Sequence, residues 1–360
     1  MPSHHSTRRS FLRTAAGSVA GGSLATVAGQ ALAQAPEAPQ QKSLNHNPEM
    51  TYRRLGKTGF MISEVALGGH GAVGPDRVAN RAAVLDRAVE LGMNYVDNNI
   101  AGECDLYGKA MAASKSAGRD KWFIGFASWP QKVTEEYEDK LTPEGMMKSI
   151  EDRLRSYNTD MLDLWRPVGA TWGKGQTNLA TLLMVTHKAL DMVVEVFEKA
   201  KQQGKVRFLG ISAHNPKVFR RVLSEYPQFS VIIFPYLFLT KEFGGDSLLK
   251  LAQEKDVGVV GLKPFGAGTV FGLKPQQLDK GQKVDPNAHL LVKRMLQEKR
   301  LSAVIPGVNV PGHLDENVKG SYQRDEPATE KDEQALDRAR RSFYAHLTPG
   351  YAWLRHWETV

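Results

Sequence analysis

The stretch FSVIIFPY at residues 229–236, with LLKLAQEK at 248–255 and VGVVGLKPF at 257–265 behind it, decides the fold. The first and third segments are nearly continuous apolar runs of strand length, whereas the apolar residues of the second recur at helical spacing. Strands that are apolar along their whole length are typical of parallel strands buried on both faces. The stretch therefore predicts two parallel strands joined by a helix.

The same alternation continues in both directions along the chain. Further strands are predicted at NYVD (94–97), KWFIGFAS (121–128), MLDLW (161–165), VRFLGIS (206–212) and LSAVIP (301–306), and a first strand ends near Gly68. Eight strands, most of them followed by a helix, predict an α/β fold, the (β/α)8 TIM barrel. An N-terminal β-hairpin with its turn at 56–59 precedes the barrel, and the chemistry of such barrels lies at the C-terminal ends of the strands.

The N-terminal segment has the pattern of an export signal. The paired Arg8 and Arg9 precede a weakly apolar Ala/Gly-rich stretch and a small-x-small site at 31–33. We predict a twin-arginine-type signal peptide over 1–35 and a periplasmic or secreted protein; a disordered basic tail is the alternative. A flexible leader is expected over 36–49, the barrel over 50–320, and a C-terminal helix and aromatic tail over 321–360.

Composition narrows the class of protein. The chain is 41% hydrophobic and 24% charged, and its formal net charge is +8. The basic residues are spread along the chain, often beside acidic ones, which argues against a nucleic-acid partner. Its one cysteine, Cys104, excludes an internal disulfide. No later apolar run is long enough to span a bilayer. A formal GxGxxG at 69–74 leaves an open dinucleotide-binding sheet as the alternative fold, although Pro75 and Asp76 follow it where a helix would begin.

Six segments in this order and spacing carry a resemblance to a known family. They are YRRLGKTGFMISEVALGG, GMNYVD, RDKWFIGF, GKVRFLGIS, GLKPFGAG and AVIPGVNVPGHLDENV. Over about residues 51–320 the chain resembles the aldo-keto reductase superfamily. The resemblance implies a (β/α)8 barrel that binds NADP(H) and reduces carbonyls with a tetrad of Asp, Tyr, Lys and His.

Three of the four tetrad residues are missing from the matching positions. Asp97 matches the tetrad Asp, but Gly102 stands where the Tyr is expected, Ala127 where the Lys is expected and Val168 where the His is expected. In the family the Lys lowers the pKa of the Tyr, because a nearby cation favours phenolate. We therefore do not expect ordinary aldehyde reduction by the family mechanism.

The cofactor side of the resemblance is better kept. Gly307, Glu316 and Asn317 match the nucleotide loop and adenine contacts, and Lys263, Pro264 and Phe265 match the loop near the pyrophosphate. Ser212 matches the serine that holds the carboxamide, and Tyr236 stands where a ring would stack on nicotinamide. The Gln expected near the end of the sixth strand is apolar, Ile233 or Phe234. The resemblance thus implies NADP(H) with fewer contacts to its amide.

Polar residues still follow several predicted strands. We expect Arg166 to be the new partner of Asp97, because a buried carboxylate needs a cation or a raised pKa. Glu103 and His214 join them as candidate catalytic residues, and His70 and Asp105 lie at the same ends. Each also has a structural reading, as a cap, a first-turn acid or a hydrogen-bonded loop histidine. A metal held by Asp97, Glu103, His70 and His214 has no supporting ligand motif, so none is predicted.

The remaining features fit either a site or a core. Cys104 is a small buried hydrophobe or a nucleophile, and the aromatic residues Tyr107, Trp129, Trp165 and Trp172 form core or the floor of a sugar site. A long loop at 169–187 follows the fourth strand at the barrel mouth, where a lid is expected.

Three functions follow from these residues. The first is an exported, rewired oxidoreductase acting on a small-molecule substrate. The second is a non-redox isomerase or lyase acting on a carbohydrate-like ligand. The third is a barrel that has lost catalysis and acts as a binding or assembly protein.

Overall fold

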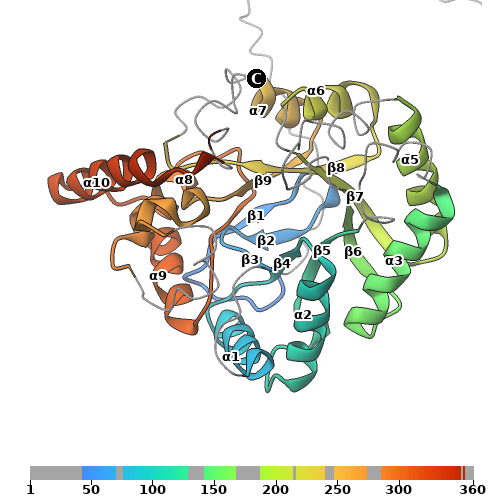
Figure 1. Cartoon of the computed structure of the whole chain (residues 1–360), viewed down its shortest axis with the longest axis horizontal. Coiled ribbons are helices and arrows are strands. Elements are labelled where there is room, and N and C mark those ends of the chain that lie inside the picture. Colours follow the sequence, from blue (N-terminus) through green and yellow to red (C-terminus); the bar gives the residue numbers. More distant parts are fainter. Residues whose placement is uncertain are drawn as a thin grey trace, which may run out of the picture. The chain divides into compact units, whose positions relative to one another are not determined.

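A computed structural model describes residues 43–69, 76–128, 142–167, 187–213, 216–239, 247–273, 285–349 and 352. Residues 41–360 form one compact unit. In this unit, helices surround a central sheet of eight strands (Figure 1). The predicted signal peptide, the loop at 169–186, His70 and His214 lie outside the described residues.

The strands are short and follow the predicted runs. They are β1 (Tyr52–Arg54), β2 (Met61–Ser63), β3 (Leu67–Gly68), β4 (Tyr95–Asn98), β5 (Phe123–Ala127), β6 (Leu162–Arg166), β7 (Val206–Ser212), β8 (Phe229–Pro235), β9 (Gly258–Leu262) and β10 (Ala303–Ile305). Strands β3 to β10 pair in sequence order, and every pairing in this sheet is parallel.

One bridge brings the two edges of the sheet together. Val65, just before β3, pairs in parallel with Val304 of β10. The backbone N–H of Ala66 donates to the Val304 carbonyl, and the Val304 N–H donates to the carbonyl of Glu64, each at 2.9 Å. The sheet is therefore a nearly closed barrel. This confirms the predicted TIM barrel and contradicts the open dinucleotide-binding sheet.

Most of the connections between strands contain a helix. These helices are α1 (Arg77–Glu90), α2 (Ala101–Ala113), α3 (Pro143–Tyr157), α5 (His187–Gln202), α6 (Pro216–Glu225), α7 (Ser247–Glu254), α8 (Ala288–Leu296), α9 (Pro311–Tyr322) and α10 (Glu330–His346), with the shorter turns η1 (Gly56–Thr58), η2 (Arg119–Lys121) and η5 (Gly266–Phe271). Thr142 caps α3, since its side chain accepts a hydrogen bond from the Gly145 N–H, and Pro143 occupies the first helical position.

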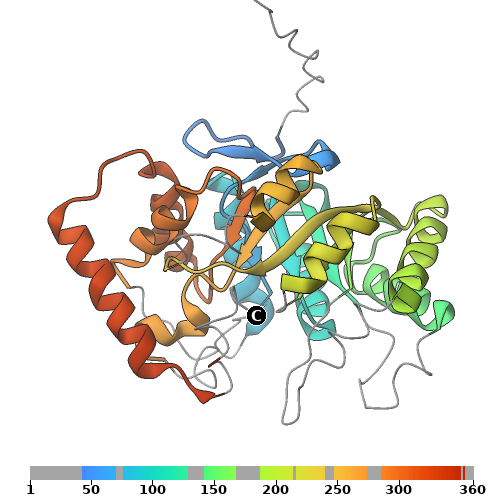
Figure 2. The same cartoon turned by 90° about the horizontal axis from the view of Figure 1, so that it is seen from above.

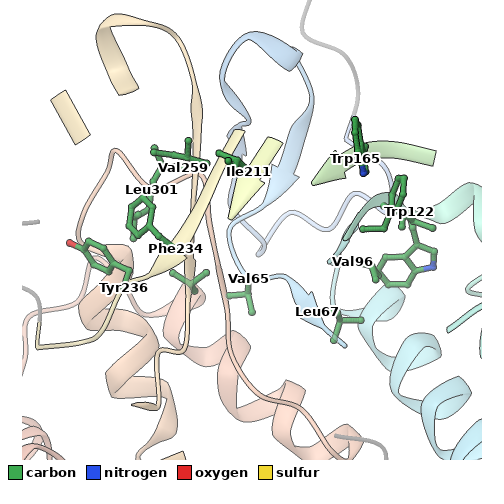
Figure 3. Packing of buried hydrophobic residues seen from close by; sticks show 14 of the residues in the cluster. Val65, Leu67, Val96, Trp122, Trp165, Ile211, Phe234, Tyr236, Val259 and Leu301 are labelled. Carbon is green, nitrogen blue, oxygen red and sulfur yellow. The ribbon is translucent and has the colours of Figure 1, made fainter. Parts of the chain in front are cut away.

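Alternation along the strands separates two buried layers. Side chains that face outward pack beneath the helices. Figure 3 labels some members of this layer, among them Val65, Phe234 and Leu301. Side chains facing inward fill the barrel with the help of the hairpin: Leu55, Ile62, Ala66, Tyr95, Phe123, Leu164, Val231, Ile233, Val260, Ala303 and Ile305. The antiparallel hairpin β1–β2 covers the N-terminal end of the barrel (Figure 2). The site is therefore sought at the opposite end.

Candidate active site

Three inward-facing side chains meet at the C-terminal ends of the strands. Asp97 lies on β4, Arg166 is the last residue of β6, and Ser212 is the last residue of β7. Along these strands Tyr95, Leu164 and Phe208 belong to the inner layer, so the residues two or four further along face inward as well. All three are buried, with 4%, 2% and 4% of their surface exposed.

Arg166 forms the predicted ion pair with Asp97. Its Nη2 donates to Asp97 Oδ1, and its Nε lies 3.3 Å from Asp97 Oδ2, so two nitrogens of the guanidinium face the two carboxylate oxygens. Ala127 of β5 lies in register beside Arg166. The small side chain at the family's lysine position thus leaves room for an arginine from the neighbouring strand to reach Asp97.

The rest of the guanidinium is also engaged. Nη1 donates to Ser212 Oγ at 2.6 Å and lies 3.5 Å from Asn99 Oδ1, while Nη2 also donates to the Asn98 carbonyl at 3.3 Å. Asp97, Arg166 and Ser212 thus form one continuous hydrogen-bonded chain across β4, β6 and β7, which we call the mouth array. A guanidinium stays charged in proteins, so the array holds a permanent cation.

Two residues on the inner face support Asp97 from inside the barrel. The Tyr95 hydroxyl donates to Asp97 Oδ2 at 3.0 Å. A Cβ placed on Gly125 of β5 would lie 2.5 Å from the same oxygen, so only glycine leaves this space. Burial raises the pKa of Asp97 above its ordinary value, and the nearby Arg166 opposes that rise. Burial and the carboxylate together raise the pKa of Tyr95 well above its ordinary value.

Glu103 lies next to the array but is held as a helix cap. Strand β4 ends at Asn98 and α2 begins at Ala101, so Gly102 falls in the first turn of the helix. The Glu103 carboxylate accepts hydrogen bonds from the backbone N–H groups of Asn99 at 2.7 Å and Ile100 at 3.4 Å. These contacts account for Glu103 structurally; its predicted part in catalysis stays a prediction.

The nucleotide loop predicted at Gly307 is uncovered at that glycine, and neighbouring side chains hydrogen-bond to its carbonyl groups. Gly307 is exposed, and a Cβ placed on it would meet no described atom within 4 Å. Asn317 Nδ2 lies 3.4 Å from the Gly307 carbonyl, and Asn80 Nδ2 donates to the Asn309 carbonyl at 3.0 Å. The buried Glu316 carboxylate contacts His289 Nδ1 at 2.5 Å. The first turn of α9 contains no acidic side chain. An anion would be favoured there, because the N-terminus of a helix carries partial positive charge.

The loop after β9 lies against the last helix. Lys263 has φ 58°, Pro264 is buried, and Phe265 packs its ring on Phe271 at 5.0 Å. Burial lowers the pKa of Lys263 to about 8. Helix α10 packs on η5, where a Cβ on Gly266 would lie 2.5 Å from the Phe343 ring.

Tyr236, the expected ring for nicotinamide, faces away from the mouth. It is 4% exposed and lies in the outward layer with Phe234, whose ring centre is 6.4 Å from its own (Figure 3). A Cβ on Gly261 would lie 3.0 Å from the Tyr236 Cβ and 3.4 Å from the Met295 methyl of α8. In this structure the ring therefore packs between the sheet and a helix.

Several other candidates have structural places. Cys104 is fully buried, and burial raises the pKa of its thiol to about 12, which favours the small buried hydrophobe over the nucleophile. Trp165 and Tyr107 belong to the core beneath the helices, as the core reading predicted. Trp129, Trp172 and His214 lie outside the described residues. Within the described ranges, no group of three potential ligands could hold a metal ion.

Three residues of the site were not predicted from the sequence. Tyr95 and Gly125 support Asp97, and Asn99 approaches Arg166. The first two lie two residues from inward-facing positions, at Asp97 and Ala127, so strand alternation would have identified them. Asn99 lies in the two-residue connection between β4 and α2.

The closed sheet and its helices define a (β/α)8 barrel protein, and sequence comparison supplies the family. The family model described as "Aldo/keto reductase family" matches residues 65–294, which is more than half of the chain. The chain belongs to the aldo/keto reductase family.

The relatives are distant but extend over most of the chain. An uncharacterised oxidoreductase, YqkF, of Bacillus subtilis is 24% identical over 80% of this chain and 95% of its own length. An L-galactose dehydrogenase of Arabidopsis thaliana is 26% identical over 74% of this chain and 86% of its own. Among solved structures, the holo form of aldo-keto reductase AKR11C1 from Bacillus halodurans has a TM-score of 0.58 at 22% identity, covering 81% of this chain and 96% of that one. This last likeness supports the fold.

Proposed function

We propose that this protein is an exported oxidoreductase that binds NADP(H) and acts on a small-molecule carbonyl or alcohol through the mouth array instead of the usual tetrad. Membership of the family supports the oxidoreductase class. The observation that carries the rest is the buried chain of hydrogen bonds from Asp97 through Arg166 to Ser212. A fully buried, charge-balanced array at the strand ends matches the place where barrels of this class do their chemistry.

The residues at the nucleotide loop fit a phosphate-bearing cofactor. Gly307 leaves its backbone open, and the start of α9 has no competing acid in its first turn. We propose that Gly307, Asn317 and Lys263 hold the nucleotide, with Glu316 fixed by His289. Pro264 and Phe265 shape the loop beside it. The bound nicotinamide would supply or accept a hydride.

The chain's own groups would act on the oxygen of the substrate. Arg166 cannot donate a proton, because its guanidinium stays charged, but it stabilises negative charge near it. Asp97 fixes the orientation of that guanidinium, because two of its nitrogens face the two carboxylate oxygens. Asp97, Glu103 and His214 remain the candidate acid–base residues; His214 follows Ser212 by two residues.

Nucleotide binding is the first test. Purified mature protein, starting at residue 36, should bind NADPH and NADP⁺ with micromolar affinity, measured by quenching of the protein's fluorescence. Gly307→Asp puts a carboxylate into the open space of the loop, so it should weaken binding at least tenfold. Gly102→Asp is the matched control, because that glycine is also exposed and a Cβ on it meets nothing within 4 Å. If neither nucleotide binds, or if Gly307→Asp binds equally well, the cofactor proposal is wrong.

Export is tested separately. Arg8→Lys with Arg9→Lys should leave the full-length chain as an uncleaved precursor inside the cell, whereas the unchanged chain is recovered in the periplasm. Equal export of both would contradict the twin-arginine proposal. Across the described residues, no helix is long and apolar enough to cross a membrane.

A further inference from the structure

The junction between β3 and β10, which we call the seam, is where the two edges of the sheet meet. In a parallel ladder every second residue of a strand donates its N–H to the neighbouring strand. Here the Val304 N–H donates to the Glu64 carbonyl, and the Ala66 N–H donates to the Val304 carbonyl. The next donor of β10 in this series would be residue 306, which is a proline and has no N–H. The backbone ladder therefore cannot continue through Pro306 toward the C-terminal end of the barrel.

Two side chains connect the two sides of the seam beyond that point. The Tyr107 hydroxyl, on α2, donates to the Gly68 carbonyl at the end of β3 at 2.6 Å. Arg81 Nη1, on α1, donates to the same hydroxyl at 3.2 Å, and Arg81 Nη2 lies 3.4 Å from the Val308 carbonyl. The guanidinium also lies over the Tyr107 ring, 5.0 Å from its centre. A chain of contacts thus runs from the end of β3 to the loop after β10.

Both side chains are suited to hold a fixed position. Arg81 is 1% exposed and Tyr107 is fully buried, so water competes little for their contacts. Burial raises the pKa of Tyr107, although the neighbouring Arg81 opposes the rise, so the hydroxyl keeps its proton for the Gly68 carbonyl at neutral pH. A guanidinium stays charged and holds its donors in a rigid plane. The two side chains therefore form a stiff link.

The residue before Arg81 holds the next carbonyl of the same loop. Asn80 Nδ2 donates to the Asn309 carbonyl at 3.0 Å, one residue after the carbonyl that faces Arg81. In a trans peptide the C=O and the following N–H point in opposite directions. Carbonyl groups that face α1 thus turn the N–H groups of Asn309 and Val310 away from it. Helices α1 and α9, which follow the two strands of the seam, lie side by side (Figure 1).

We propose that Arg81 and Tyr107 are positioning residues that set the conformation of the nucleotide loop at 307–309 across the seam. The inference rests on the proposed function, because it assumes that this loop binds a nucleotide. Both side chains are buried behind the loop, so they act through its backbone. A loop that is already held in its binding conformation has less freedom to lose when the ligand arrives, which raises affinity without adding a contact.

The affinity for NADP⁺, measured by calorimetry, tests the positioning role. Tyr107→Phe removes the hydroxyl and keeps the ring, and we expect the dissociation constant to rise roughly 3- to 10-fold. Arg81→Met should raise it further. Arg81→Lys keeps the charge but not the planar donors, so it should recover part of that loss. In the double variant of Arg81→Met and Tyr107→Phe the two fold-changes should not multiply, because both residues act through the same link.

Tyr52→Phe is the matched control. The Tyr52 hydroxyl also donates to a backbone carbonyl, that of Gly92 at 2.8 Å, but it lies on β1 in the hairpin that covers the N-terminal end. Tyr52→Phe should lower the stability to urea, as Tyr107→Phe does, and should leave the NADP⁺ affinity within about twofold of the unchanged protein. If Tyr107 had only a structural role, both variants would lose stability and neither would lose affinity, which would overturn the proposal.

Amide hydrogen exchange tests the link without a nucleotide. In the free protein the amides of residues 308–310 should exchange about tenfold faster in Tyr107→Phe, because local opening of the loop becomes easier, and Tyr52→Phe should leave them unchanged. Equal exchange in all three proteins would overturn the link. NADP⁺ that fails to bind the unchanged protein contradicts the proposed function and the positioning role with it. NADP⁺ that binds the unchanged protein, Tyr107→Phe and Arg81→Lys equally well contradicts the positioning role alone.

Discussion

Two buried aspartates lie toward opposite ends of the barrel, and they are paired in different ways. Asp97 at the C-terminal end pairs, within the described ranges, with one cation, Arg166, and both are almost completely covered. Asp163 near the N-terminal end accepts from two, Arg119 at 3.1 Å and Arg207, and also from the Ile124 backbone N–H at 2.8 Å.

The cations around Asp163 reach the surface. Their side chains are 24% and 38% exposed for Arg119 and Arg207, and the Arg207 guanidinium lies over the Phe60 ring of the hairpin at 4.4 Å. Loss of one contact there leaves others in place. In the mouth array Arg166 is, among the described residues, the one cation that contacts Asp97. Redundant pairing suits an end that closes the barrel, whereas pairing to one buried cation suits an end that binds a ligand.

Removing the single cation should have the largest effect. Arg166→Met leaves Asp97 buried and unpaired, so we expect the unfolding free energy at pH 7 to fall by about 3–5 kcal/mol. The measurement is urea unfolding at pH 7 and at pH 5. The pKa of Asp97 is already raised in the folded protein, so its folded state holds the proton more tightly than the unfolded chain does. Stability from this group therefore falls as pH rises above its ordinary value of 3.8 towards the folded pKa.

In Arg166→Met the pKa of Asp97 should rise further, because the cation that opposed its rise is gone. The pH range over which stability falls therefore extends upward. The loss should thus be smaller at pH 5, where more of Asp97 is protonated. Asp97→Asn in the same chain is the control, and the double variant should recover part of the loss. An equal loss at both pH values, with no recovery in the double variant, would show that the ion pair is not what Arg166 contributes.

The space beside Asp97 gives the next largest effect. Gly125→Ala places a Cβ 2.5 Å from Asp97 Oδ2 and 3.1 Å from the Tyr95 hydroxyl, so the array must shift. We expect a loss of about 1–3 kcal/mol in unfolding free energy, typical of overpacking, measured by thermal and urea unfolding. Gly102→Ala is matched to it, since that helix position is open, and it should be neutral or stabilising by up to about 1 kcal/mol. Equal effects of the two substitutions would contradict the crowded packing at Gly125.

The barrel and the Arg166 pair could be predicted from the sequence, and the reasons are local. The apolar runs at 229–236 and 257–265 are β8 and β9, and the turn at 56–59 contains η1 with Gly59 at φ 74°. Strand order placed Arg166 near Asp97, because the two residues lie at the C-terminal ends of the parallel strands on either side of β5. These inferences needed only periodicity and chain order.

Side-chain direction and connection length could not be predicted as well. Tyr236 follows an apolar strand, and such a run does not tell which residues face the barrel and which face the helices. Its ring packs outward. Glu103 was expected at the mouth, but the two-residue connection after β4 starts α2 early and makes the carboxylate a cap.

The smallest expected effect is at the redundant end. Arg207→Met removes one cation from Asp163 and its contact with the Phe60 ring, but Arg119 and the Ile124 N–H remain. Because the side chain is partly exposed, water screens the pair, and we expect a loss of only about 1 kcal/mol in unfolding free energy. Urea unfolding at low and high salt measures it, and salt should shrink the difference. NADPH affinity should stay unchanged, since the variant lies at the other end of the barrel. A loss as large as that of Arg166→Met would mean that both ends depend on single contacts, and the contrast between a closing end and a binding end would no longer hold.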